Sequence, residues 1–202
     1  MSNVRRTWWV AGCAVAAALG GCHSAPTRIY TLGRAAPASR MDVYQAPALR
    51  VDMLNVPAGW DRIEILKLSA AGTLQINDFD HWAAPLAQMA RQTLSDDLDQ
   101  RLPSSSVIYP RLPKPIGALG VNVDILEFSV ASSQASMRVS WVIAPAAGSQ
   151  TAKRGLASLH ESLTSPEPAA VAHAWSKLIG QLADRIAADA ASMKMPQLNP
   201  AD

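Results

Sequence analysis

Residues 119–131 read LGVNVDILEFSVA and carry the clearest strand pattern in the chain. Apolar residues alternate with small or polar ones from Leu119 to Ile125, which is typical of a strand with one buried face. The apolar positions then change parity at Phe128. A slip of one residue predicts a β-bulge near Leu126 and Glu127.

Two further strands and a helix follow this stretch. The ranges Met137–Ile143 and Arg154–Leu163 are strand-like and separated by turns, so we expect a three-stranded meander. Ser165-Pro166-Glu167 then predicts a helix start, with a capping serine, a proline in the first turn and an acidic residue beside it. One face of this helix is apolar and comprises Val171, Ala174, Trp175, Leu178, Leu182 and Ile186.

The residues before position 119 predict strands around one more helix. Short strands are expected at 28–32, 49–56, 63–68, 73–77 and 106–109. A helix is expected from about Trp82 to Leu102, with Asp80 as its cap and Pro85 in its first turn. Strands, helix, strand, meander and helix in this order predict an α/β domain in which two long helices pack on a mixed β-sheet.

The N-terminus has the three parts of an export signal. Arg5 and Arg6 precede a short apolar stretch, Trp8–Leu19, which is followed by Gly-Gly-Cys22. Twelve residues are too few to span a bilayer core of about 30 Å as a helix. Leu-Gly-Gly-Cys resembles the lipobox of bacterial lipoproteins, which implies cleavage before Cys22 and lipid attachment to its thiol. The alternative is an ordinary signal peptide followed by a chance cysteine.

The chain is therefore expected to have four parts. Residues 1–21 are a lipoprotein signal peptide, residues 22–47 hold the lipidated cysteine, a first short strand and a tether, residues 48–193 form the α/β domain, and residues 194–202 are a disordered tail. His23 follows the lipid cysteine where lipoproteins retained at the inner membrane usually have aspartate. We therefore expect an anchor in the outer membrane, with the domain on its periplasmic face.

The charge and cysteine content exclude a nucleic-acid-binding protein and a disulfide-stabilised one. The chain has 18 Lys and Arg against 16 Asp and Glu, and the signal holds two of the basic residues and no acidic one. The mature chain is thus formally neutral and lacks the excess of basic residues that binds nucleic acid. Cys13 leaves with the signal and Cys22 is the lipid site, so no disulfide is expected.

No pattern of catalytic or cofactor-binding residues is evident. The histidines do not have metal-ligand spacing, and there is no phosphate-binding glycine loop. Ser104–Ser106 lacks the frame of a hydrolase nucleophile, and Asp78, Asp80 and His81 are interpreted as turn and capping residues rather than an acid–base site. We predict a non-enzymatic protein without cofactor or metal.

Trp60 is the one tryptophan placed in a predicted turn, Pro57–Trp60. Tryptophan and arginine are enriched at binding hot spots, so Trp60 and Arg62 are candidate partner contacts. The alternative is that the Trp60 ring folds back onto the core of its own domain.

Three stretches together resemble one family: RIYTL at 28–32, VPAGWDRIEI at 56–65 and HWAAPL at 81–86. With the lipobox, their order and spacing resemble the ABC-type transport auxiliary lipoproteins, a PqiC-like family, over about residues 22–190. The resemblance implies a three-layer α/β domain and a docking or assembly subunit, at the outer membrane, of a mammalian-cell-entry (MCE) type lipid transport system. The implied partners are the MCE-type periplasmic protein, its inner-membrane components and further copies of the chain.

A second interpretation is a periplasmic shuttle domain that carries phospholipid itself. It would require an apolar cavity of several hundred cubic ångströms between the sheet and a helix.

Overall fold

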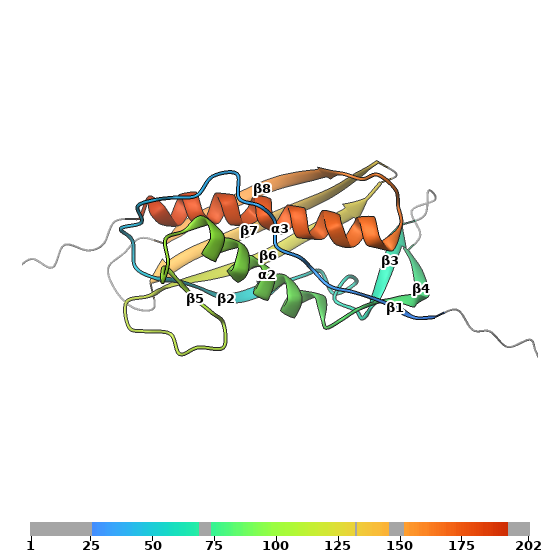
Figure 1. Ribbon diagram of the computed structural model, residues 1–202, viewed down its shortest axis with the longest axis horizontal. Coiled ribbons are helices and arrows are strands. Elements are labelled where there is room, and N and C mark those ends of the chain that lie inside the picture. The colour runs from blue at the N-terminus through green and yellow to red at the C-terminus, as the bar shows by residue number, and fades with distance from the viewer. Residues whose placement is uncertain (1–25, 69–73, 132, 146–151, 194–202) are drawn as a thin grey trace, which may run out of the picture.

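The computed structural model describes residues 26–68, 74–131, 133–145 and 152–193 of the chain (Figure 1). The elements, in chain order, are β1 (Arg28–Tyr30), β2 (Leu49–Asn55), β3 (Glu64–Leu68), β4 (Leu74–Trp82), α2 (Leu86–Arg101), β5 (Val107–Ile108), β6 (Leu119–Val130), β7 (Gln134–Pro145), β8 (Lys153–Ser162) and α3 (Pro168–Ala191). The predicted α/β class and the two long helices are confirmed.

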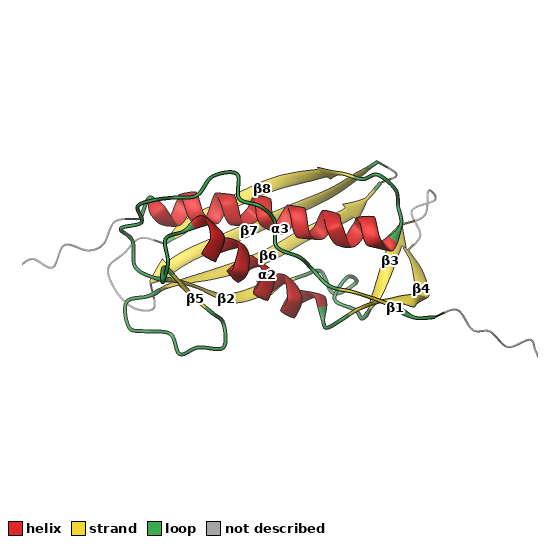
Figure 2. Ribbon diagram, in the orientation of Figure 1, coloured by secondary structure: helices red, strands yellow, loops and turns green. Residues whose placement is uncertain are grey.

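The strands form two mixed sheets, which Figure 2 shows in yellow. The larger sheet has the order β5-β2-β6-β7-β8, and β2 runs parallel to both β5 and β6. The smaller sheet has the order β1-β4-β3, with β1 parallel to β4. The sequence pattern led us to expect one sheet, because alternation identifies strands without indicating which strands pair.

Both helices pack on the same face of the five-stranded sheet, α2 against β2 and α3 against β7 and β8. Alternate residues of β6 and β7 are buried against them, whereas the intervening residues are more exposed. Trp175 lies at the centre of this core and is fully buried. The apolar face predicted for the last helix is therefore the buried face of α3.

The predicted bulge in β6 is confirmed. The register between β6 and β7 shifts between Ile125 and Glu127. The shift turns Phe128 inward, where its ring stacks on Trp175 with centroids 4.0 Å apart. The change of parity in the sequence thus places an aromatic pair between sheet and helix.

The predicted start of the first helix is wrong. Residues up to Trp82 belong to β4, and α2 begins at Leu86. Asp80, expected to cap the helix, is fully buried in the strand. Its carboxylate accepts hydrogen bonds from Arg28 at 2.8 Å and from the Tyr30 hydroxyl at 2.9 Å, so it fastens β1 to β4.

The first turn of α2 is capped from a distant loop instead. The Asp61 carboxylate accepts a hydrogen bond from the backbone N–H of Ala87 at 3.1 Å. An acidic side chain at this position satisfies a free amide and opposes the positive end of the helix dipole. The last helix likewise starts later than predicted, at Pro168, and Glu167 occupies its N-cap position without a capping hydrogen bond from its side chain.

The segment 31–47 runs in extended form across the outer side of the helices (Figure 1). The backbone N–H of Gly33 donates to Ser176 on α3 at 3.0 Å, and that of Ala35 donates to Asp97 on α2 at 2.9 Å. Sheet, helix pair and this segment lie one upon another. The segment therefore packs as part of the fold and fastens the two helices together.

The predicted signal peptide, Cys22 and the tail at 194–202 lie outside the described residues. Within the described part of the chain, no helix is both long and apolar enough to cross a membrane.

Candidate functional site

The loop that carries Trp60 and Arg62 is held at several points. Trp60 is half-buried, and its ring meets Phe128 edge-on with centroids 4.8 Å apart. Arg62 donates to Glu64 at 3.2 Å and keeps 42% of its side chain exposed. The Trp60 ring therefore packs onto the core, while the Arg62 side chain remains accessible on the surface of the loop.

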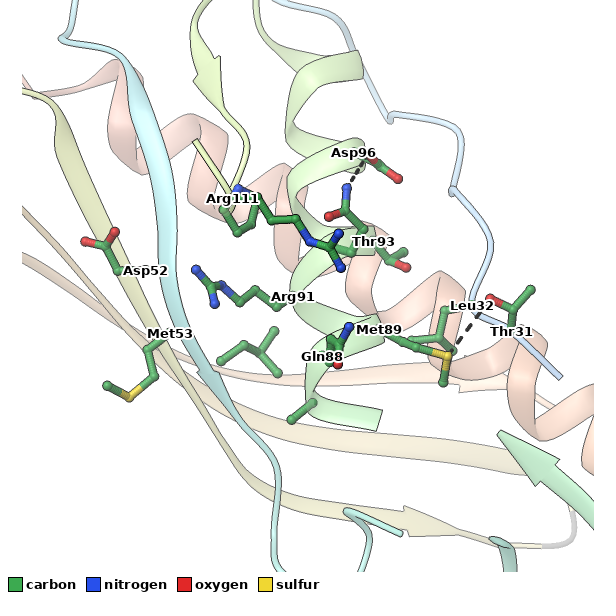
Figure 3. Close-up of a pocket in the computed structure, with 14 residues that line it drawn as sticks. Thr31, Leu32, Asp52, Met53, Gln88, Met89, Arg91, Thr93, Asp96 and Arg111 are labelled. Atoms are coloured by element: carbon green, nitrogen blue, oxygen red, sulfur yellow. Dashed lines mark hydrogen bonds between the residues drawn. The ribbon is translucent and has the colours of Figure 1, made fainter. Parts of the chain in front are cut away.

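An open groove of about 760 Å³ lies between α2 and β2. Its wall on one side is α2 around Gln88, Arg91 and Gln92, and on the other side β2 around Met53. The loop after β5 closes one end with Arg111 (Figure 3). The groove follows β2 because β5 pairs only with Leu49 and Arg50, and no other strand of the described residues pairs with the rest of that edge.

Two guanidinium groups extend into this groove (Figure 3). Arg91 donates through Nε to the carbonyl of Val51 at 3.0 Å, and its two terminal nitrogens make no further bond to a described residue. Arg111 is exposed and makes no hydrogen bond or ion pair with the described part of the chain. Both groups are available to bind a carboxylate or phosphate.

The carboxylates that line the groove are already neutralised. Asp52 accepts hydrogen bonds from Arg50 at 2.6 Å and Lys114 at 2.7 Å. Burial acts to raise the pKa of Asp52, but these two bonds outweigh it and hold the pKa below its ordinary value. Asp96 pairs with Arg34 at 3.6 Å. The groove is therefore left with an excess of positive charge.

A buried charged cluster lies where the segment 31–47 crosses the helices. Arg101 is 1% exposed and donates to Asp184 at 2.5 Å, to the carbonyl of Gly180 at 2.9 Å and to the carbonyl of Asp97 at 2.8 Å. Gly180 is required there, because a side chain would collide with Ala35 at 2.3 Å. The arginine thus joins α2 to α3 beneath the extended segment.

Asp97 completes this cluster. One carboxylate oxygen accepts the Ala35 N–H, whereas the other has no hydrogen-bond partner and is buried. Burial raises the pKa of Asp97 to about 6, even though the Ala35 N–H and Arg101 act in the opposite direction. The cluster has no access to a substrate and its role is structural.

The sequence did not point to the groove or to the buried cluster. Arg91 and Arg111 are ordinary surface arginines in the sequence, and only the fold brings them together. Asp97 and Arg101 could have been noticed, because both fall on the side of α2 that carries Leu94 and Leu98. Among the described residues, no group of histidine, cysteine and acidic side chains could hold a metal ion.

Comparison with known proteins identifies the family. The ABC-type transport auxiliary lipoprotein family matches residues 30–187. No curated protein matches the chain. A solved structure of an uncharacterized protein superposes with a TM-score of 0.66 at 16% identity, covering 81% of this chain and 98% of the other.

A second solved structure, a Xanthomonas campestris protein of the DUF330 family, has a TM-score of 0.59 at 16% identity and covers 79% of this chain and 92% of the other. At these identities the two structures establish a shared fold. The family match extends over most of the chain, from β1 to the last turns of α3, and this chain belongs to the ABC-type transport auxiliary lipoproteins, a PqiC-like family that is not a family of enzymes.

Proposed function

We propose that this protein is a non-enzymatic docking or assembly subunit of an MCE-type lipid transport system, anchored through Cys22 to the periplasmic face of the outer membrane. The observation that carries the proposal is membership of the transport auxiliary lipoprotein family. The lipobox supports lipid attachment at Cys22, and His23 in place of aspartate supports the outer membrane as the site of the anchor. A domain of this kind acts through its surface, so its partner is the MCE-type periplasmic protein with its inner-membrane components.

The groove is the surface best suited to this docking. It is open, it lies along a strand edge, and Arg91 and Arg111, which form no ion pair with any described residue, favour acidic side chains of the partner. Arginine binds carboxylates through two parallel hydrogen bonds, which gives orientation as well as affinity. The loop of Trp60 and Arg62 is a second candidate contact.

The alternative, a shuttle that carries phospholipid, finds less support. It needs an enclosed apolar cavity, whereas the space between the five-stranded sheet and the helices is filled by buried Leu, Val and Trp side chains. The groove itself is open and mixed in character, with charged and amide side chains of α2 and of the loop after β5 set among apolar ones such as Met53 and Met89. Neither feature suits two acyl chains.

The test is affinity purification of the full-length lipidated protein from detergent-solubilised envelopes. Recovery of an MCE-type protein, identified by mass spectrometry and absent when an unrelated outer-membrane lipoprotein is the bait, supports the proposal. Failure to recover it from cells that express both proteins contradicts the proposal. One phospholipid molecule bound per protein chain, in addition to the covalent lipid anchor, would favour the shuttle.

A further inference from the structure

The three-stranded sheet concentrates exposed apolar side chains. Ten large hydrophobic residues are exposed in the described part of the chain, and four of them lie in this sheet or directly before it: Ile29, Ile63, Ile76 and Phe79. The three strands comprise only 3, 5 and 9 residues. Ile63 lies outside the strands and Ile76 lies across the register shift between β3 and β4, so the exposed apolar side chains that can share one face of the sheet are Ile29 and Phe79.

Strand register places two of these side chains on the outer face. Ile29 pairs with His81, and Phe79 lies two residues before His81, so Ile29 and Phe79 project from the same side. Asp80 and Trp82 project from the opposite side and are buried. Ile29 is 70% exposed and Phe79 is 42% exposed.

The chain length between the lipid site and β1 limits where this sheet can lie. Five residues, 23–27, lie between Cys22 and Arg28, and the six fully extended steps from Cys22 to Arg28 span about 20 Å. The 24 residues of α3 are about 36 Å long. A lipid on Cys22 therefore holds β1 closer to the bilayer than the length of this helix.

The sheet also lies at one end of the molecule. Figure 1 places β1, β3 and β4 together at one end, while β5 and the loop that follows it lie at the other. With an anchor attached next to β1, the end with the three-stranded sheet would face the membrane. The end with β5 would then point into the periplasm.

We propose that the outer face of this sheet, with Ile29 and Phe79, rests on the bilayer that holds the lipid anchor. Two apolar side chains would not retain a protein at a membrane by themselves. The lipid anchor already retains the protein, and because it keeps the domain beside the bilayer it raises the effective concentration of the sheet at the membrane. The contact orients the domain, and this inference rests on the Cys22 anchor of the proposed function.

The test uses the full-length lipidated protein in phosphatidylethanolamine and phosphatidylglycerol vesicles. The mature chain has no cysteine other than the acylated one, so Ile29→Cys or Phe79→Cys introduces a single free thiol for the fluorophore NBD. Matched controls are Leu156→Cys, 63% exposed on β8, and Ile116→Cys, which is fully exposed in the loop after β5. We expect a blue shift at positions 29 and 79, and quenching there by spin-labelled lipid, with neither effect at 116 and 156.

Each other outcome overturns the inference in a distinguishable way. Protein that floats with the vesicles but is quenched equally at all four positions has an anchor and no fixed orientation. A blue shift at 29 and 79 that needs no vesicles and grows with protein concentration identifies a second copy as the occupant. Protein that does not float with the vesicles lacks the lipid anchor, so the anchor and the membrane contact of the sheet are both refuted. Binding of the MCE-type partner is measured separately, by the affinity purification described above.

Discussion

The indole of Trp60 meets the ring of Phe128 edge-on, with the two centroids 4.8 Å apart. Phe128 in turn stacks on Trp175 of α3. The loop that was predicted to contact a partner is thus connected through two rings to the core. This relationship separates the roles of Trp60 and Arg62, which lie two residues apart.

Trp60→Ala should lower the free energy of unfolding, whereas Arg62→Ala should leave it almost unchanged. Loss of an aromatic pair costs about 0.5–1.5 kcal/mol beyond the lost burial, and an exposed ion pair contributes about 0–1 kcal/mol. Urea unfolding measures both variants, and purification of the partner is done on the same samples. Lost partner binding in Arg62→Ala at wild-type stability supports the contact, and full binding in both variants removes it.

Trp175→Ala should destabilise the protein by about 3–5 kcal/mol, as is typical of a large buried aromatic residue. Trp175→Phe is the matched control, because phenylalanine can keep the stack on Phe128 and removes a buried indole N–H that has no hydrogen-bond partner. We expect the phenylalanine variant to lose much less. Equal losses in the two variants, measured by urea unfolding, would show that the stack contributes little.

Asp97 should make the protein less stable as the pH rises. Its pKa is about 6 in the folded protein, above the ordinary value of 3.8. Between these values the native state holds a proton that the unfolded chain has released, so the free energy of unfolding falls through this interval. The groups that face it are Arg101, Asp96 and Asp184.

Urea unfolding at about pH 4 and about pH 7.5 measures this dependence. Asp97→Asn removes the titration, so the variant should lose less stability than the wild type between the two conditions. An unchanged pH dependence in the variant would assign the effect to other groups.

Arg111→Glu should weaken binding of the MCE-type partner by about tenfold, or about 1.4 kcal/mol, without changing the melting temperature. The side chain is exposed and makes no bond within the described residues, so only the charge of the groove changes. Arg154→Glu is the matched control, because it reverses an exposed charge on β8 at the opposite edge of the same sheet. Equal weakening by both variants would indicate a general charge effect, and binding at the wild-type level in both would exclude the groove.

Cys22→Ala should abolish attachment to the outer membrane. Without the thiol there is no site for the diacylglycerol, and one or more acyl chains are what hold such a protein at a bilayer. Fractionation of envelopes should place the variant in the periplasm or leave it uncleaved. A variant that still sediments with outer membranes would refute the anchor.

Local patterns in the sequence predicted the elements well and their partners poorly. The bulge near Glu127 and the buried face of α3 follow from parity and helical spacing alone. Asp80 was misassigned because capping is a local signal, whereas its partner Arg28 lies 52 residues away in the sequence. Strand length has the same limitation, since the end of β4 up to Trp82 is held by pairing with β1 and with the start of β3, which lie elsewhere in the sequence.

The candidate site was less predictable still. The groove exists because β5 is two residues long and ends beside β2, and no property of Arg91 or Arg111 alone indicates this. The buried cluster left a weak signal, with Asp97 and Arg101 on an apolar helix face. The contact of Gly180 with Ala35 left none, because it joins residues from opposite ends of the chain.

The way in which β1 joins the fold determines how the protein bears mechanical load. With the lipid anchor proposed at Cys22, a pull from the membrane would enter at the N-terminal end of β1 and act along the strand. Because β1 is parallel to β4 and linked to it by the Arg28–Asp80 pair, the force shears several hydrogen bonds at once instead of opening them one by one. Behind β1, the segment bonded to Asp97 and Ser176 would have to slide along both helices before the domain unfolded, so this end of the fold resists a pull on its N-terminal side.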